Sequence, residues 1–325
     1  MKLKKTSTAF FAIIFLFCVV AAQAVTIDLM TVGNPNNAAD VSSFGSVDYT
    51  YQIGKYEVTN AQYTEFLNAV DINGTNLYVL YNSNMGSGYG GITFTSGKSS
   101  GSKYAVISGR GDMAVNWVSF WDACRFTNWL SNGQGNVDTE NGSYTLTADG
   151  INNNTITRNT NWTWAVASTN EWYKAAYYDP NRSGGAGYWL YPTCSNNAPS
   201  ATEPPGDNTG NGSANYNNAV GDLTNVGAYT YKPSTSPYGT YDQGGNVGEW
   251  TETVVVDSLH RNLRGGTFLG DTNYMAAYSQ YIYLAYPTFE NYDLGFRVAS
   301  VPEPGSITLL VCGVIAGLMW RRRTK

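Results

Sequence analysis

Two carboxylate residues, Asp242 and Glu249, flank a glycine-rich stretch that could bind a metal ion. The stretch reads DQGGNVGE. Glycines permit a tight turn that leaves backbone carbonyls free, and Ca²⁺ takes about six to eight oxygen ligands from carboxylates and carbonyls together. The stretch therefore predicts a calcium site, with a solvent-facing glycine turn as the alternative.

Other patterns imitate catalytic motifs but lack the partners that the chemistry needs. Residues 86–91 match G-x-G-x-x-G, although no strand is expected before them and no helix after them. Residues 97–101 match G-x-S-x-G, but a serine nucleophile needs a base, and His260 is the only histidine of the chain. One histidine also cannot form a histidine metal cluster. We therefore expect His260 to be an ordinary surface residue near Arg261.

Cysteine chemistry is restricted to two residues of the body of the chain. Cys18 and Cys312 lie in terminal segments that are expected to be removed, which leaves Cys124 and Cys194. These two could form one disulfide in an oxidising compartment or stay as buried thiols. The sequence leaves both alternatives open.

The charge distribution argues against a nucleic-acid partner. The chain has 325 residues, of which 19 are basic and 24 acidic. Seven of the basic residues and one acidic residue, Glu303, lie at the two ends, so residues 25–300 hold 12 basic and 23 acidic residues and carry a net charge of −11. A nucleic-acid binder needs a basic surface, which this body lacks. The acidic excess suits calcium or a cationic partner, with simple solubility as the alternative.

Residues 1–24 have the features of a secretory signal peptide. Three lysines precede an uninterrupted apolar run, and Ala22-Gln23-Ala24 has the pattern of a cleavage site. We therefore expect export across the inner membrane.

The last 25 residues have a second targeting pattern. Pro302-Glu303-Pro304 is followed by an apolar run at 305–320 and by three arginines at 321–323. Segment 301–325 thus resembles the PEP-CTERM sorting signal of Gram-negative bacteria. The resemblance implies a transient transmembrane segment at 305–320, an exosortase-type sorting protease as partner, and a destination in the cell envelope or outside it. A plain membrane anchor is the alternative.

Three amphipathic helices must position any site in the body. Each is predicted by a capping box, in which a Ser or Thr and a polar residue three positions later satisfy free backbone N–H groups. The boxes lie at 59–62, 119–122 and 168–171, and Pro180 is expected to stop the third helix. Residues 144–147 and 155–157 alternate as in a β-hairpin. Residues 86–102 are predicted to be an exposed loop, and the Asn/Gly/Pro-rich loop 193–221 must be held by packing or by an ion.

No composition shift divides residues 25–300, which we read as one irregular α+β domain. Six of its segments, in order, resemble the formylglycine-generating enzyme family, also called the sulfatase-modifying-factor family. They lie at 51–63, 114–123, 168–176, 238–250, 264–268 and 295–298 and include EVTN, GNVGEW, RGG and GFR. The resemblance implies a mixed α/β fold that is distantly related to C-type lectins.

The resemblance also assigns metal positions. It places one calcium site on Asp242 and Glu249 through side chains and on Gly245 and Val247 through backbone oxygens. A second calcium falls near Asn215 and Tyr216, with Asp222 as a further ligand. The active enzymes bind copper through two cysteines, which here fall on Gly270 and Met275. Since thiolates select Cu(I), we expect copper to be absent.

These features predict an exported, calcium-stabilised binding or structural module that lacks the copper–cysteine oxidase site. A polysaccharide or a protein is its expected ligand. Nine Trp and 25 Tyr could supply stacking surfaces, with burial of most of them in the core as the alternative. The alternative is a divergent formylglycine-generating oxidase acting on an exported protein. A third hypothesis is unrelated chemistry with Arg264, Glu249 or Asp271 as acid–base groups.

Overall fold

Two four-stranded sheets form the centre of the molecule, as the computed structural model shows for residues 24–231, 234–279 and 283–301. Residues 1–23 of the expected signal peptide and the expected span 305–320 lie outside the described residues. The first sheet is antiparallel and has the order β1 (Leu29–Val32), β2 (Tyr51–Gly54), β14 (Val298–Ser300) and β5 (Trp164–Val166). The second has the order β12 (Tyr283–Ala285), β11 (Arg261–Arg264), β10 (Gly248–Val254) and β13 (Leu294–Phe296), with β10 and β13 parallel.

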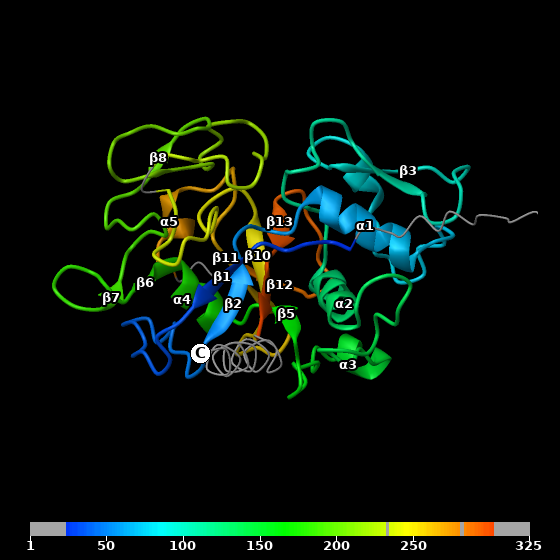
Figure 1. Cartoon of the computed structure of the whole chain (residues 1–325), viewed down its shortest axis with the longest axis horizontal. Coiled ribbons are helices and arrows are strands. Elements are labelled where there is room, and N and C mark those ends of the chain that lie inside the picture. The colour runs from blue at the N-terminus through cyan, green and yellow to red at the C-terminus, as the bar shows by residue number, and fades with distance from the viewer. Residues whose placement is uncertain (1–23, 232–233, 280–282, 302–325) are drawn as a thin grey trace, which may run out of the picture.

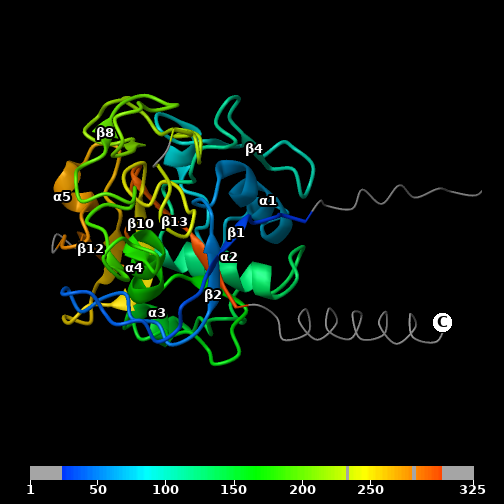
Figure 2. The ribbon, with the colours of Figure 1, turned by 60° about the vertical axis from the view of Figure 1, so that its left-hand side comes forward.

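The two sheets are joined through a single residue. Strand β13 ends at Phe296 and β14 begins at Val298, so the chain passes from the second sheet to the first at Arg297. Helices lie on both sides of these strands (Figure 1), with α1 (Asn60–Val70), α2 (Phe120–Ser131) and α3 (Ala148–Asn152) on one side and α4 (Thr169–Tyr177) and α5 (Thr272–Met275) on the other. In Figure 2, which is turned by 60°, α1 lies in the right half of the molecule and α5 at its left edge.

The three predicted amphipathic helices are confirmed as α1, α2 and α4. Each begins with the predicted capping box, at Thr59, Ser119 and Ser168, respectively. Helix α4 ends at Tyr177, three residues before Pro180. The caps satisfy backbone N–H groups that have no partner inside a helix, so local sequence is sufficient to start these helices.

Two local predictions were wrong. The expected hairpin at 144–157 is replaced by helix α3, because the Thr147 hydroxyl accepts a hydrogen bond from the Gly150 N–H and caps a helical turn. The expected loop at 86–102 contains β3 (Ile92–Phe94), which pairs with β4 (Tyr104–Val106) and follows the 3₁₀ helix η1 (Ser83–Gly86).

The long loop 193–221 is held by hydrogen bonds within itself and to segments outside it, such as those from the N–H groups of Asn217 and Asn218 to the carbonyls of Gly270 and Phe268. It contains the two-residue parallel pair β8 (Ser200–Ala201) and β9 (Ser213–Ala214). The preceding segment forms the antiparallel pair β6 (Tyr178–Asp179) and β7 (Gly187–Tyr188). The architecture is therefore the irregular mixed α/β fold that the sequence predicts.

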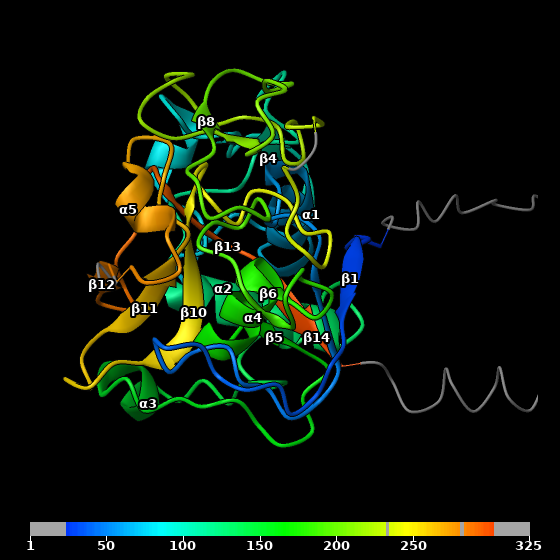
Figure 3. The same cartoon turned by 90° about the vertical axis from the view of Figure 1, so that its left-hand side faces the viewer.

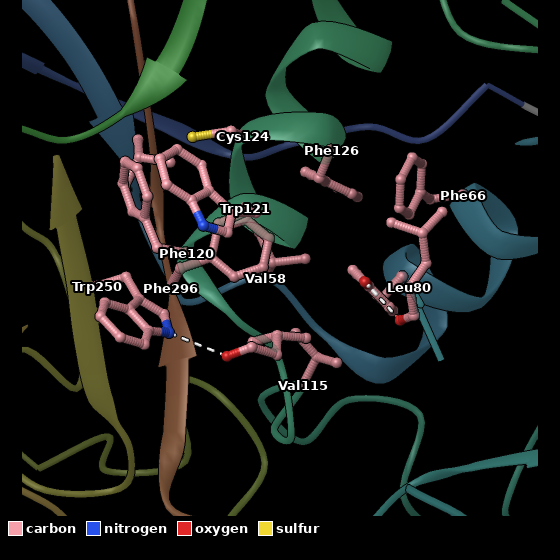
Figure 4. Close-up of a cluster of buried hydrophobic side chains, with 14 of the residues drawn as sticks. Val58, Phe66, Leu80, Val115, Phe120, Trp121, Cys124, Phe126, Trp250 and Phe296 are labelled. Atoms are coloured by element: carbon pink, nitrogen blue, oxygen red, sulfur yellow. Dashed lines mark hydrogen bonds between the residues drawn. The ribbon is translucent and has the colours of Figure 1, made fainter. Parts of the chain in front are cut away.

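The main apolar core lies between α1, α2 and the two sheets (Figure 4). Phe66, Phe126 and Phe296 are fully buried there, and their rings pack edge to face. The Trp250 indole N–H donates to the Val118 carbonyl at 2.9 Å and ties β10 to the segment before α2. Among the described residues, no helix is both long enough and apolar enough to cross a membrane.

Candidate functional site

Arg297, at the junction of the two sheets, is the centre of a buried charge cluster. Its Nε and Nη2 donate to the two carboxylate oxygens of Glu249 at 2.6 and 2.7 Å, and all these groups are fully buried. The Trp172 indole N–H donates to the same carboxylate at 2.7 Å. Arg297 also donates to the carbonyls of Gly54 and Tyr241 at 3.0 and 2.9 Å. One side chain thus fastens β2, β10 and the segment before β10 together.

A second carboxylate, Glu57, is less well compensated. Its Oε2 lies 3.8 Å from Arg297 Nη2 and has no hydrogen-bond partner, while its Oε1 accepts from the Asn246 amide at 3.0 Å. Burial, together with the negative charges of Asp242 and Glu249, holds the pKa of Glu57 well above its ordinary value. The positive charge of Arg297 therefore faces the negative charges of two buried carboxylates, those of Glu249 and Glu57.

Asp242 lies at the edge of this cluster, in a strained turn. Its φ is 58°, and its Oδ2 accepts from the Gly227 N–H at 2.6 Å. Burial raises the pKa of Asp242 to about 6. Gly245, three residues later, has a φ of 86° and donates its N–H to the Gly265 carbonyl. The glycine-rich stretch is thus a tight turn, as expected.

The first predicted calcium site does not fit the arrangement of its carboxylates. Both oxygens of Glu249 accept hydrogen bonds from Arg297, so this side chain does not face a cation together with Asp242. Among the described residues, no group of three or more His, Cys, Asp or Glu side chains could hold a metal ion. The involvement of Gly245 and Val247 through backbone oxygens stays a prediction.

The second predicted site offers one oxygen that suits a cation. Asn215 Oδ1 is buried without a hydrogen-bond partner, while its amide nitrogen donates to the Asp222 carbonyl at 2.8 Å. A buried oxygen without a donor is costly, and a bound cation would relieve that cost. The Asp222 carboxylate, in contrast, pairs with Arg110 at 2.8 and 2.9 Å. The fit at this site therefore depends on Asn215 Oδ1, because the neighbouring carbonyl of Tyr216 already accepts one hydrogen bond, from the Ala219 N–H at 3.1 Å.

The two positions that the family resemblance assigns to copper are filled by ordinary packing. Met275 is fully buried in a small cluster with Tyr191, Ala214 and Tyr216. Gly270 lies against Thr267, to whose carbonyl it donates its N–H at 3.0 Å. Neither position carries a thiolate, so the donor set that selects Cu(I) is missing. The residues present do not fit copper.

The three proposed acid–base residues are not brought together. Glu249 and Arg264 are opposite each other in the pairing of β10 and β11, but Glu249 binds Arg297 instead. The Arg264 guanidinium stacks over the Phe44 ring at 4.6 Å, and burial lowers its pKa. Asp271 caps α5 by accepting from the Asn273 N–H. The three side chains thus have separate partners.

The two cysteines of the body are free thiols. Cys124 is buried in α2, and Cys194 is half-buried and lies 3.3 Å from the Thr235 carbonyl. Burial raises the pKa of both, to about 12 for Cys194. Of the two alternatives left open by the sequence, the structure therefore has the unpaired thiols and not the disulfide.

A cleft of about 370 Å³ opens beside β11, β12 and β13. Its apolar wall includes Leu284, Tyr286 and Phe289, which are 47%, 57% and 47% exposed. Its polar residues include His260, Asn291 and Asp293. Figure 3 shows β11 and β12 at one side of the molecule, below α5. Thr267 lines the cleft and also contacts Gly270, so the cleft lies beside this residue.

His260 has a more specific environment than the sequence suggests. Its Nδ1 lies 2.5 Å from Asp257 Oδ2, and its ring lies 4.3 Å from that of Tyr286. Asp293 is buried enough that its pKa is raised, and its Oδ1 has no hydrogen-bond partner. Sequence analysis missed this cleft. The aromatic residues between the RGG and GFR segments were the available signal, but their exposure depends on tertiary packing.

Comparison with known proteins agrees with this architecture. Residues 34–301 match the family described as the sulfatase-modifying factor enzyme 1-like domain, and residues 300–323 match the PEP-CTERM protein-sorting motif. That motif implies export, sorting to the envelope in Gram-negative bacteria, and recognition by an exosortase-type sorting system. No curated protein matches the chain.

Several solved structures are similar in fold. Variable protein 1 of Treponema denticola has 20% identity and a TM-score of 0.50 over 87% of this chain and 98% of that chain. CarF has 19% identity and a TM-score of 0.51 over 86% of this chain and 99% of that chain. PvdO of Pseudomonas aeruginosa has 17% identity and a TM-score of 0.47 over 85% and 92% of the two chains. The match to residues 34–301, together with the fold, shows that this chain belongs to the sulfatase-modifying factor enzyme 1-like domain family and carries a C-terminal PEP-CTERM sorting motif.

Proposed function

We propose that this protein is a sorted binding module of the cell envelope that holds a saccharide in the cleft beside β11 and β12. The observation that carries the proposal is the exposure of Tyr286 and Phe289 in a cleft of about 370 Å³. This volume lies in the range of about 300–1,000 Å³ that is usual for ligand sites.

The chemistry of the cleft favours a saccharide over a purely apolar ligand. The C–H face of a sugar ring packs against an exposed aromatic ring such as Tyr286, because both surfaces are flat and apolar. Its hydroxyl groups can bond to the polar atoms of His260, Asn291 and Asp293, which line the same cleft. The buried Asp293 Oδ1, which has no partner, suits a hydroxyl donor. A protein ligand is the competing outcome.

Replacing Tyr286 with alanine is expected to weaken saccharide binding at least tenfold, because it removes the most exposed aromatic ring of the cleft. Binding to neutral and acidic exopolysaccharide fragments would be measured by calorimetry. Tyr231→Ala is the matched control, since Tyr231 is 48% exposed and does not line the cleft. Equal binding by wild type and Tyr286→Ala would contradict the proposal, as would binding of a peptide but of no saccharide.

The divergent oxidase is the alternative function, and copper binding separates it from a binding module. We expect no stoichiometric Cu(I) binding by the wild type, because Gly270 and Met275 supply no thiolate. The double variant Gly270→Cys/Met275→Cys is expected to gain a Cu(I) site. A competition assay with a colorimetric Cu(I) chelator measures both. Tight binding by the wild type, with conversion of a cysteine peptide to an aldehyde, would favour the oxidase.

We further propose that a calcium ion stabilises the domain at Asn215 Oδ1 and the Tyr216 carbonyl. When bound, the ion would supply the missing partner of the buried Asn215 oxygen and cross-link the loop before β10. Removing the ion with a chelator is expected to lower the melting temperature by roughly 5 °C or more.

Two variants locate that calcium site. Asn215→Ala is expected to abolish the effect of the chelator, whereas Asp242→Ala is expected to preserve it. If Asp242→Ala abolished the effect of the chelator and Asn215→Ala preserved it, the ion would lie at the glycine-rich stretch that contains Asp242. A melting curve that the chelator leaves unchanged would remove calcium from the proposal.

A further inference from the structure

Val25, the residue after the predicted cleavage site, is held by one side chain through both of its backbone groups. Its N–H donates to Gln134 Oε1 at 2.6 Å, and Gln134 Nε2 donates to its carbonyl at 2.9 Å. The two bonds close a ring between a side-chain amide and the backbone of a residue 109 positions earlier. Such a pair fixes the position and the direction of the chain at Val25.

Gln134 is held in a fixed turn after α2. Gly133, Gln134 and Gly135 have φ values of 87°, 66° and 72°. This left-handed conformation suits glycine but is unfavourable for a residue with a Cβ atom. Two hydrogen bonds with Trp129 hold the turn. The Trp129 indole N–H donates to the Gly135 carbonyl at 2.9 Å, and the Gln134 N–H donates to the Trp129 carbonyl at 3.0 Å. The side-chain amide is therefore presented on a rigid support.

The residues that follow Val25 are attached to the body of the domain. The side chains of Val25 and Ile27 are partly buried and pack against the main core. The Thr26 carbonyl accepts from Gln62 Nε2, on α1, at 2.9 Å. Ala24, in contrast, is exposed. Among the described residues, which start at Ala24, Val25 is the first with its backbone bonded to the body of the domain.

We propose that the mature protein begins at Val25 and that Gln134 is a binding site for its new α-ammonium group. A signal peptidase hydrolyses the Ala24–Val25 amide. The C–N bond breaks, water supplies the hydroxyl of the Ala24 carboxyl group, and Val25 receives the proton that completes its amine.

The new amine suits the oxygen that faces it. An α-amino group has an ordinary pKa of about 7.7–8.0 and is mostly charged at pH 7. It then donates a charge-assisted hydrogen bond to Gln134 Oε1, which is stronger than the bond of a neutral amide. The bond from Gln134 Nε2 to the Val25 carbonyl does not depend on cleavage. The site thus secures the mature end of the exported chain.

The test uses full-length precursor expressed and exported in a Gram-negative host. Intact-mass and terminal-peptide analysis are expected to give Val25 as the first residue. An amine-acylating reagent at pH 7 then measures access to the α-amine, because exposed lysines have much higher pKa values and react slowly. Burial lowers the pKa of Lys174 to about 8, so acylation is read on the Val25 peptide itself. We expect acylation of Val25 to be about tenfold faster in Gln134→Ala than in the wild type.

Two further variants make the result specific. Gln134→Glu keeps an oxygen acceptor and is expected to retain the slow rate, although it loses the donor to the Val25 carbonyl. Asn153→Ala, which removes an exposed amide that bonds only to Asp149, is expected to behave as the wild type. A different first residue, or equal rates in wild type and Gln134→Ala, would overturn the proposal. It is independent of the ligand in the cleft.

Discussion

Replacing Arg297 with methionine is expected to lower the free energy of unfolding by about 3–5 kcal/mol, because it leaves buried carboxylates without a cation. Glu249 loses both of its bonds to the guanidinium, and Glu57 loses the nearest positive charge. The carbonyls of Gly54 and Tyr241 also lose a donor. Methionine fills a similar volume, so the loss reports charge and hydrogen bonding more than packing. Urea denaturation measures it.

Two companion variants test this cause. Arg297→Met/Glu249→Gln removes one of the stranded charges and is expected to recover about 1–2 kcal/mol. Lys98→Met removes a cation from an exposed loop and is expected to change stability by less than about 0.5 kcal/mol. If the double variant were less stable than Arg297→Met, an unpaired carboxylate would not be the cause.

The single variant Arg297→Met is expected to become less stable as the pH rises. Burial and the neighbouring carboxylates raise the pKa of Glu57, whereas Arg297 lowers it. Without Arg297, the folded protein binds the Glu57 proton still more tightly than the unfolded chain does. The stability of Arg297→Met is then greatest below the pKa that Glu57 has in the unfolded chain, near 4.5. It falls as the pH rises toward the pKa that Glu57 has in the folded protein. The deficit relative to wild type should therefore be smaller at pH 4 than at pH 8.

Replacing Gly245 with alanine is expected to cost about 3–5 kcal/mol through backbone strain and steric overlap combined. Gly245 has a φ of 86°, and a Cβ atom there would lie 2.2 Å from the carbonyl oxygen of Asn215. That carbonyl already accepts the Asn246 N–H at 2.8 Å, so neither segment can move without losing a hydrogen bond. Thermal and urea denaturation measure the loss.

Gly210→Ala separates the two contributions. Gly210 has a φ of 89°, but nothing lies within 4 Å of an added Cβ atom. We expect a cost of about 1–2 kcal/mol there, from backbone strain alone. Equal losses at the two glycines would show that the contact with Asn215 contributes nothing.

Much of the architecture follows from local sequence. The capping boxes at Thr59, Ser119 and Ser168 start the three long helices where they were expected, because a cap is satisfied by residues three positions apart. The family segments also predicted the fold, which the match to residues 34–301 and the similar structures confirm. Even so, the alternation at 144–157 was misleading, since Thr147 caps α3 there.

The candidate sites depend on residues that are far apart in the chain. Arg297 and Glu249 are separated by 48 positions, and the parallel pairing of β10 with β13 brings them close together. No sequence pattern could show that Glu249 serves a buried ion pair, that Asn215 Oδ1 has no partner, or that Tyr286 and Phe289 stay exposed. The sequence by itself determined the family, the C-terminal sorting motif and the helix starts, because these depend on near neighbours and short motifs. Only the tertiary structure decided the pairing of the buried charges and the cleft, because burial and partner choice are properties of the packed chain.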